Sequence, residues 1–313
     1  MADLSEYKKL LKTLLKAERY EHSLGASETA KKLAERWGAD AEKAELAGLL
    51  HDITKNMSNA EQLKMLEKYG VPLTESVLAC PFIWHSYTSA FYVRDVLGIS
   101  DTEIFDGIYY HTTGKKGMTL FEKVIYIADL VEPTRTYPDA KRLYALAFED
   151  LDEVVFESAK WCLFKNSRDG GYIYGDTFEL YNECVLKRRK KMNEKIFDMA
   201  KIAATALSDK KGQDIKVIKV AEKTTLADYL VICNGSSSTQ IRALADECEY
   251  RLKEAGYAEL HREGQPGGDW ILLDFKDIIV HVFSKEARAF YDLERFWKDG
   301  EEIEMDFGVK EEN

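Results

Sequence analysis

The sequence predicts a two-domain protein, with an all-α domain over residues 1–192 followed by a small α/β domain with a mixed sheet over residues 193–313. The length of 313 residues is comfortable for two domains. Apolar residues recur at intervals of three and four from residue 4 to about residue 207, which is typical of amphipathic helices. After that point, short β-branched stretches alternate with helical ones, and this alternation indicates a sheet packed against helices.

In the first domain, the helical periodicity is clear in "YKKLLKTLL", "AELAGLLHDI", "AEQLKMLEKYG" and "FEKVIYIADLV". Stretches rich in glycine and proline, such as "YGVP", "TTGKKG" and "EPTRTYPD", separate these segments and predict the turns between helices. The domain is therefore expected to be a bundle of short helices.

In the second domain, "DIKVIKV", "ADYLVICNG", "GDWILLDF" and "DIIVHVFS" are predicted strands, and "STQIRALADECEYRLKEAG" and "EARAFYDLERFW" are predicted helices. The segment that joins the domains is the basic stretch "LKRRKKMNEK", from Leu186 to Lys195. It is interpreted as a solvated helix face, with a contact to anionic RNA as the alternative.

The composition, 45% hydrophobic and 32% charged, is that of a globular protein. No stretch reaches the roughly 18 apolar residues of a membrane span, and the charged amphipathic start is unlike a signal peptide, so a cytoplasmic location is expected. The net charge is −11, of which −8 falls on residues 193–313. This charge argues against non-specific binding of nucleic acid and favours a basic protein partner for the second domain, and neither DNA nor a membrane is an expected partner.

Four histidines and two aspartates on different predicted helices form the first candidate site. They are His22, His51, Asp52, His85, His111 and Asp129. A lone helix histidine is usually structural, but a carboxylate inside "VIYIADLV" would cost several kcal/mol if buried without a partner. A metal ion held in the core of the bundle would pair with all of these groups at once.

The order H…HD…H…H…D resembles the HD-domain phosphohydrolases, and the two additional histidines resemble the binuclear members. By this resemblance His22, His51, Asp52 and Asp129 hold one ion, while His85 and His111 hold a second that Asp52 bridges to the first. The resemblance implies two metal ions, with iron as the expected metal and manganese as the alternative.

The stretches "LLHDITK", "WHSYTSA", "YYHTTG", "MTLFEKVIYIADLVEPTRTYPD" and "YIYGDTFELYN" are similar to the YqeK-type HD hydrolases. This resemblance implies symmetrical cleavage of diadenosine tetraphosphate to two ADP, with Asp52 and Lys55 as catalytic residues. The predicted contacts to the substrate phosphates are Lys55, Thr113, Gly114 and Arg135, although surface salt bridges would also explain the two cations. In the family a small residue such as Gly usually follows the histidine that corresponds to His85, whereas this chain has Ser86 and Tyr87. This departure bears on how the substrate fits more than on metal binding.

Two alternatives remain open for the first domain. The substrate could be another nucleotide, such as a nucleoside monophosphate, a cyclic dinucleotide or (p)ppGpp. The HD domain could also be a scaffold without turnover, in a chain that acts only as a ribosome-binding repressor of translation.

The second domain lacks the strand-borne carboxylate pair that a nucleotidyltransferase needs, so transferase activity is not expected. The stretches "TTLADYLVICNGSSSTQIRALAD", "REGQPGGDWILLDFKDIIVHVF" and "ARAFYDLERFW" resemble the ribosomal silencing factors (RsfS, or Iojap), which have a nucleotidyltransferase-like fold. The resemblance implies binding to a protein of the large ribosomal subunit, a block of subunit joining, and a capacity to form homodimers. The predicted interface residues are Trp270, Leu273 and Tyr291, with a purely structural role in the core as the alternative for Trp270.

Overall fold

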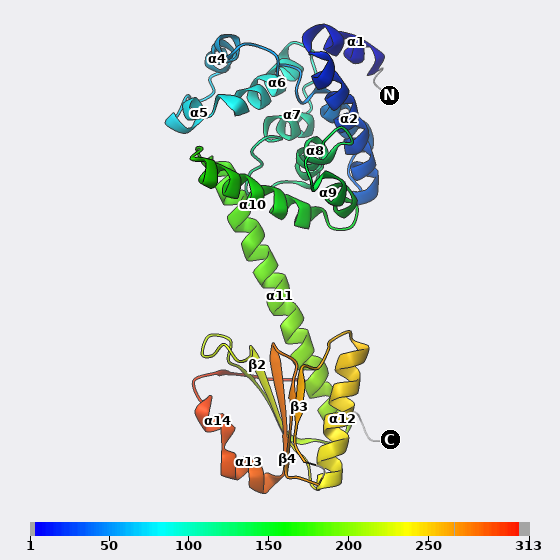
Figure 1. Ribbon diagram of the computed structural model, residues 1–313, viewed down its shortest axis with the longest axis vertical. Helices are drawn as coiled ribbons and strands as arrows, with labels where there is room; N and C mark the ends of the chain where they lie inside the picture. Colours follow the sequence, from blue (N-terminus) through cyan, green and yellow to red (C-terminus); the bar gives the residue numbers. More distant parts are fainter. Residues whose placement is uncertain (1–3, 266, 307–313) are drawn as a thin grey trace. The chain divides into compact units, whose positions relative to one another are not determined.

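The computed structural model describes residues 4–265 and 267–306. It divides into two compact units, the first ending at Lys187 and the second beginning at Arg188. The boundary lies inside one long helix, α11 (Gly175–Asp209), whose first part belongs to one unit and whose last part belongs to the other (Figure 1). Each unit is described separately below.

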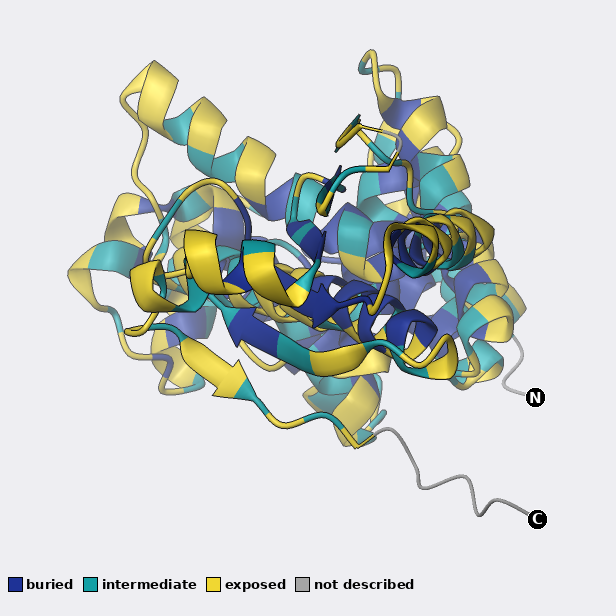
Figure 2. Cartoon of the chain, turned by 90° about the horizontal axis from the view of Figure 1, so that it is seen from below, coloured by how far each residue is buried: buried dark blue, intermediate teal, exposed yellow. Residues whose placement is uncertain are grey.

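From residue 4 onward, the first unit contains helices and no strand, as predicted. Its elements are α1 (Leu4–Leu14), α2 (Ala17–Trp37), α3 (Ala41–Leu50), α4 (Asn59–Lys68), α5 (Glu75–Ala79), the 3₁₀ turn η1 (Pro81–Ile83), α6 (Trp84–Asp95), α7 (Thr102–Tyr109), α8 (Leu120–Val131), α9 (Ala140–Ala147), α10 (Leu151–Asp169) and the first part of α11. Figure 2 colours the described residues by burial, and single helices in it carry both buried and exposed positions. The core joins apolar side chains of α2, α3, α7, α8 and α10.

Helices α2 and α3 pack closely because α3 has a glycine at the contact. A Cβ atom on Gly48 would lie 2.8 Å from the carbonyl oxygen of Ala26 and 3.0 Å from the Cα of Ser27. Any larger residue would push the two helices apart, since packed interiors have little free volume. The contact fixes the end of α3, where His51 follows, against the helix that carries His22.

Local contacts also fix the start of α8 and the position of α6. The hydroxyl of Thr119 accepts a hydrogen bond from the backbone N–H of Glu122, whose carboxylate accepts one from the N–H of Thr119, which is a capping box. On α6, the indole of Trp84 donates to the carbonyl of Val77 at 2.7 Å and packs in a second small apolar cluster. These contacts fix the helices that carry Asp129 and His85.

The second unit contains a six-stranded mixed sheet, in agreement with the predicted α/β class. Its strands are β1 (Gln213–Lys219), β2 (Tyr229–Asn234), β3 (His261–Glu263), β4 (Trp270–Asp274), β5 (Ile278–Phe283) and β6 (Glu301–Ile303), in the order β3-β4-β5-β2-β1-β6. The pair β2 and β5 is parallel, and the other neighbours are antiparallel.

Helices cover both faces of this sheet. The last part of α11 and helix α12 (Ser238–Glu254) pack their apolar side chains on one face. The short helices α13 (Lys285–Tyr291) and α14 (Leu293–Phe296) lie at the other face, against a smaller cluster that includes Phe283. The sequence did not predict the two edge strands β3 and β6, which are only three residues long and too short for an alternating pattern to be recognised.

No helix among the described residues is both long enough and apolar enough to cross a membrane.

Candidate metal centre

The structure brings the six predicted metal ligands together in the core of the first unit. His22 comes from the middle of α2, Asp129 from α8, and His85 from the first turn of α6. His51 and Asp52 follow the last residue of α3, and His51 keeps helical backbone angles (φ −54°, ψ −33°). His111 lies just beyond the end of α7. Five separate segments therefore converge on one place.

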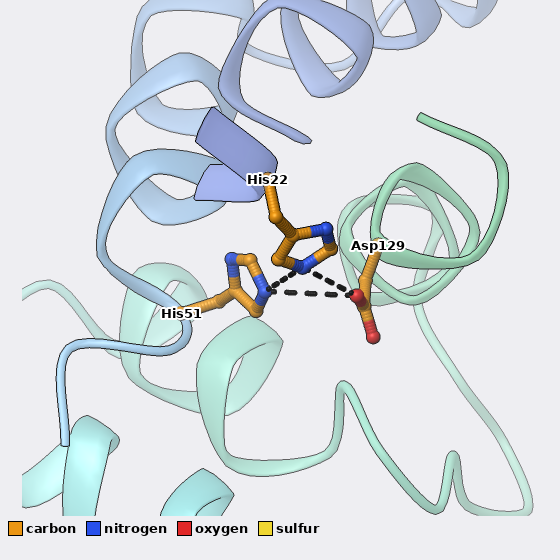
Figure 3. A group of neighbouring side chains, drawn as sticks. All are labelled: His22, His51 and Asp129. Atoms are coloured by element: carbon orange, nitrogen blue, oxygen red, sulfur yellow. Dashed lines mark hydrogen bonds and ion pairs between the residues drawn. The ribbon is translucent and has the colours of Figure 1, made fainter. Parts of the chain in front are cut away.

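Three of these residues form a first group, drawn in Figure 3. The Nε2 atom of His22 lies 3.1 Å from Nε2 of His51 and 3.0 Å from Oδ1 of Asp129. Nε2 of His51 is 3.7 Å from the same carboxylate oxygen. The group has the donor types and the spacing that can hold a metal ion.

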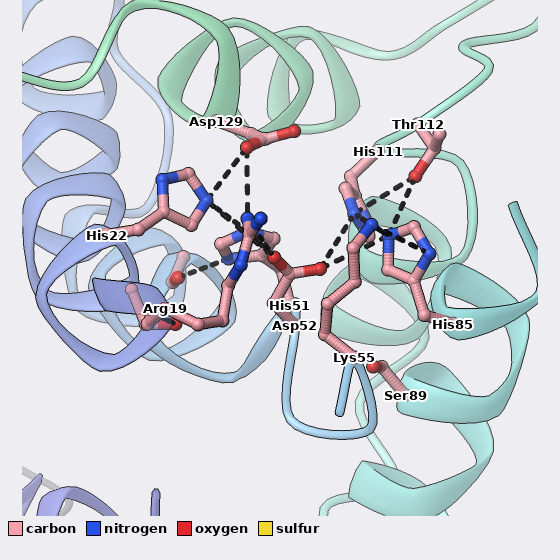
Figure 4. Close-up of polar contacts among 12 residues, drawn as sticks. Arg19, His22, His51, Asp52, Lys55, His85, Ser89, His111, Thr112 and Asp129 are labelled. Carbon is pink, nitrogen blue, oxygen red and sulfur yellow. Dashed lines mark hydrogen bonds and ion pairs between the residues drawn. The ribbon is translucent and has the colours of Figure 1, made fainter. Parts of the chain in front are cut away.

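Asp52 connects this first group to a second one (Figure 4). Its Oδ1 atom lies 3.1 Å from Nε2 of His85 and 3.7 Å from Nε2 of His111. Its Oδ2 atom lies 3.7 Å from Nε2 of His22 and 3.5 Å from Nε2 of His51. One carboxylate thus presents an oxygen atom to each pair of histidines, which is the arrangement of a bridging ligand.

The other ring nitrogen of three histidines already has a partner. Nδ1 of His51 lies 2.7 Å from the carbonyl of Gly48, and Nδ1 of His111 lies 2.7 Å from the carbonyl of Ile108. Carbonyls only accept, so both Nδ1 atoms carry a proton, and in the neutral form of each ring Nε2 presents a lone pair. Nδ1 of His22 is 2.9 Å from a carboxylate oxygen of Glu132, which orients the ring in the same way.

In their neutral forms these rings suit a cation. The Nε2 atoms of His85 and His111 are only 3.2 Å apart, close enough for both to face one ion. Lys55 and Thr112 also reach them, at 2.9 Å from Nε2 of His85 and 3.1 Å from Nε2 of His111. Among the described residues, the buried Oδ1 of Asp52 has no hydrogen-bond partner, although Nε2 of His85 lies 3.1 Å away. A metal ion would satisfy both the lone pairs and this oxygen, so the donor set fits the ions that the sequence predicted.

The electrostatics of the cluster set the protonation states. Burial disfavours a charged His51, but the negative charges of Asp52 and Asp129 outweigh burial and raise its pKa to about 10. Burial lowers the pKa of His85 to about 4 and also lowers the pKa of His111. The pKa values of both aspartates are held well below the usual value in spite of burial, chiefly by the neighbouring histidines. The carboxylates are thus ionised, and a cation at His51 must compete with a proton.

The two predicted phosphate-binding cations lie at the cluster. The Nζ atom of Lys55 is 2.9 Å from Nε2 of His85, and burial lowers the pKa of Lys55. Arg135 donates to the backbone carbonyl of Asp129 from Nε and Nη2, at 2.9 and 2.7 Å, and its Nη2 also contacts the Asp129 carboxylate. Arg135 is therefore tied to a predicted ligand, and its contact with a phosphate stays a prediction.

The other two predicted substrate contacts have their polar groups engaged elsewhere. The hydroxyl of Thr113 donates to the carbonyl of Gly114, and the N–H of Gly114 donates to the carbonyl of Tyr110 at 2.8 Å. The hydroxyl that lies beside the histidines belongs to Thr112, at 3.1 Å from Nε2 of His111. The role of Thr113 and Gly114 at a phosphate remains a prediction, and Thr112 is the neighbour that the sequence did not single out.

Two more residues of the site were missed in the sequence. Glu132 is 1% exposed and is the partner of His22, and its carboxylate also accepts hydrogen bonds from Thr134. Arg19 contacts Oδ2 of Asp52 at 2.8 Å. A signal for Arg19 was present, since residues three apart on a helix share a face and Arg19 precedes His22 by three. Glu132 lies three positions after Asp129 but directly beyond the end of α8, so the same spacing gave a weaker signal for it.

In the second unit, the sheet separates the predicted interface residues. Trp270 is half-buried beside α13, with its ring stacked on Phe283 at a centroid distance of 5.0 Å and tilted against the ring of Tyr291 at 4.9 Å. Leu273 is fully buried in the core on the opposite face. Side chains alternate along a strand, so positions 270 and 273 of β4 point to opposite faces, and the prediction of Leu273 as a direct interface contact was wrong. Trp270 and Tyr291 remain predicted interface residues.

Comparison with known proteins assigns a family to each unit. A family model described as "HD domain" matches residues 19–134, and one described as "Ribosomal silencing factor during starvation" matches residues 193–313. The symmetrical bis(5'-nucleosyl)-tetraphosphatase of Bacillus subtilis is 37% identical over 175 residues, which is 56% of this chain and 94% of that protein. The silencing factor RsfS of the same organism is 38% identical over 120 residues, which is 38% of this chain and 100% of that protein. The first unit belongs to the symmetrical tetraphosphatase family, and the second belongs to the RsfS family.

The likeness of the tetraphosphatase-family unit extends to a solved structure. A protein from Clostridium acetobutylicum, described as a predicted HD superfamily hydrolase involved in NAD metabolism, is 31% identical with a TM-score of 0.58. The match covers 60% of this chain and 99% of that one. The expected fusion of an HD-type hydrolase with a ribosomal silencing factor is thus confirmed.

Proposed function

We propose that the tetraphosphatase-family unit cleaves diadenosine tetraphosphate symmetrically to two ADP with two metal ions, and that the RsfS-family unit binds the large ribosomal subunit in the cytoplasm and blocks subunit joining. The bridging position of Asp52, with one oxygen toward each histidine pair, is the observation that carries the first half of this proposal. The likeness to tetraphosphatases of several bacteria supports the substrate class.

The first ion would be held by His22, His51, Asp52 and Asp129, and the second by His85, His111 and Asp52. When bound there, such ions supply Lewis acidity toward phosphoryl oxygens and a hydroxide nucleophile at neutral pH. The water oxygen adds to one of the two central phosphorus atoms, the bond from that phosphorus to the central bridging oxygen breaks, and both products leave as ADP. Lys55, beside His85, would stabilise the charge that develops on the leaving oxygen.

The donor set also bears on which metal is bound. Four imidazoles and two carboxylates suit first-row transition ions better than magnesium or calcium, which prefer oxygen ligands alone. We propose iron as the resident metal, with manganese as the substitute, and elemental analysis of protein purified without added metal tests this choice.

Product analysis by chromatography tests the function directly. The full chain loaded with iron(II) or manganese is expected to convert diadenosine tetraphosphate to ADP as the sole product. Formation of AMP and ATP would keep the hydrolase and reject symmetrical cleavage. No product with either metal would reject the substrate, and a panel of nucleoside monophosphates, cyclic dinucleotides and (p)ppGpp would then distinguish a different hydrolase from a scaffold without turnover.

The proposed ribosome contact is the aromatic surface formed by Trp270, Tyr291 and the neighbouring Phe290. Phe290 is 82% exposed and Tyr291 is 45% exposed, so this surface offers large rings to a partner. Aromatic anchors of this kind dominate the energy of many interfaces, and the acidic charge of residues 193–313 favours a basic ribosomal protein.

Replacing Trp270 with Ala is expected to weaken co-sedimentation with purified large subunits by about thirtyfold or more, the effect of one interface hot spot. Hydrolysis of the dinucleotide should not change. Since Trp270 also packs on Phe283, Tyr291→Ala serves as a second variant with a smaller effect on folding. Tyr250→Ala, an exposed tyrosine on α12, is the matched control. Unchanged sedimentation of both Trp270→Ala and Tyr291→Ala would place the ribosome contact elsewhere.

A further inference from the structure

Arg19 is a cation at the metal centre, and the proposed mechanism assigns no role to it. It lies on α2, one turn before His22, and donates from Nη1 to Oδ2 of Asp52 at 2.8 Å. The side chain of Arg19 is 30% exposed, whereas that of Asp52 is 2% exposed. In Figure 4 the Arg19 side chain reaches toward Asp52 from α2, and Lys55 approaches the same region from the turn after α3. Arg19 thus connects the buried carboxylate with solvent.

The hydrogen bonds of Arg19 differ from those of the second arginine at the site. Arg135 donates to the backbone carbonyl of Asp129 through two nitrogens, contacts the Asp129 carboxylate, and lies 3.5 Å from Glu132. For Arg19, the described part of the chain provides one acceptor, Oδ2 of Asp52. A guanidinium has five N–H donors in a planar fork, so most of the donors of Arg19 are available to another acceptor.

The surroundings of Arg19 favour an anion as that acceptor. Arg19, Lys55 and Arg135 are close enough that the charges of both arginines lower the pKa of Lys55, although burial is the largest cause. The carboxylates of Asp52 and Asp129 lie among these cations and offset their repulsion. Metal ions held by those carboxylates would leave the cations to pair with another anion. A metal ion bound by Asp52 would neutralise the carboxylate that Arg19 now contacts. The guanidinium group of Arg19 could then donate to a phosphate.

We propose that Arg19 binds the phosphate chain of the substrate beside the metal centre. This assignment rests on the proposed hydrolysis of a dinucleoside polyphosphate and adds to it a residue that recognises the diphosphate half. Arg19 then acts on the affinity for the nucleotide and not on the binding of metal. The competing role is that Arg19 only positions Asp52, in which case its loss would disturb the metal ligand itself.

Binding and kinetics of Arg19→Ala and Arg19→Lys in the manganese-loaded full chain separate these two roles. The probe is ADP, titrated by calorimetry, and the kinetic substrate is diadenosine tetraphosphate. Hydrogen bonds to a charged group correspond to roughly a ten- to hundredfold change in affinity. Arg19→Ala is expected to weaken ADP binding and raise KM by this factor, with manganese affinity unchanged. Arg19→Lys should recover part of the loss, because it restores the charge but not the fork.

Arg36→Ala is the matched control, since Arg36 lies on the same helix but is exposed and donates to the carbonyl of Phe148. Unchanged affinity for ADP in Arg19→Ala would overturn the proposal, and so would a parallel loss of manganese. If the wild-type chain cleaves no diadenosine tetraphosphate, the proposed function fails, while the ADP titration still decides whether Arg19 is a phosphate ligand.

Discussion

Replacing Asp52 with Asn is expected to lower kcat for diadenosine tetraphosphate by about a thousandfold or more. Asp52 is 1% exposed and is placed between both histidine pairs, so it is the one side chain that both proposed ions would share. An amide has nearly the same shape but carries no charge and has only one oxygen. Metal ions supply several kcal/mol to such reactions, and each 1.36 kcal/mol corresponds to a factor of ten in rate.

The measurement combines steady-state kinetics with the metal content of the purified variant. Asp95→Asn is the control, because Asp95 is an exposed aspartate of the same unit paired with Arg94. Binding of the Asp52→Asn chain to large ribosomal subunits should equal that of the wild type. A variant with full metal content and near wild-type turnover would refute the bridging role of Asp52, and loss of ribosome binding would refute the separation of the two functions.

Acidification is expected to destabilise the RsfS-family unit through His281. Burial lowers the pKa of His281 to about 4, and its Nδ1 accepts a hydrogen bond from the indole of Trp270 at 3.3 Å. A protonated ring could not accept this bond. In the unfolded chain the histidine has its ordinary pKa of about 6.5.

The direction follows from proton binding. Between about pH 6.5 and 4 the unfolded state binds more protons at this position than the folded state, so the free energy of unfolding decreases as the pH falls. The contribution is fully present above about pH 6.5 and is lost as the pH falls to about 4, with a total of roughly 3 kcal/mol. His281 is 6% exposed, so solvent screening reduces this value little.

Calorimetry of the full chain between pH 7.5 and 4.5 measures this effect. On acidification, the transition of the RsfS-family unit in the wild type should shift to lower temperature. The free energy of unfolding of this unit should depend on pH more steeply than in His281→Phe, by up to about 1.4 kcal/mol per pH unit. Phenylalanine keeps a ring at the position that stacks on Phe283 and removes the titrating group. The exposed His261, replaced by Gln, provides the control. Equal slopes in wild type and His281→Phe would contradict the prediction.

The helices and central strands could be predicted because their side-chain periods extend over many residues, as in "FEKVIYIADLV". The edge strands β3 and β6 could not, since three residues show no period. The error at Leu273 has another origin. Leu273 is hydrophobic and close in sequence to Trp270, which favours an interface role, but two side chains three positions apart on a strand point to opposite faces of the sheet.

The residues of the candidate metal centre could be singled out from the sequence because His and Asp interrupt apolar helices, where their burial has a cost. The residues that orient those ligands were less accessible. Glu132 reaches His22 across the space between two helices, at a sequence separation of 110, and only the folded chain shows that contact. Thr112 and Thr113 are adjacent, and the direction of each hydroxyl depends on the local turn, which the sequence pattern does not define.

Helix α11 has a thermodynamic consequence. Residues 186–195, between the part that packs in the first unit and the part that packs in the second, are all exposed. A helical segment without a buried face contributes little packing energy, so it cannot make the melting of one unit depend strongly on the other. Heating should therefore give two calorimetric transitions. Metal or nucleotide would raise only the first unit's melting temperature by mass action, and a ribosomal ligand would raise only the second's.

The lysines and arginines of residues 186–195 also make this segment a preferred target for trypsin. Cleavage there would release two folded fragments from one chain.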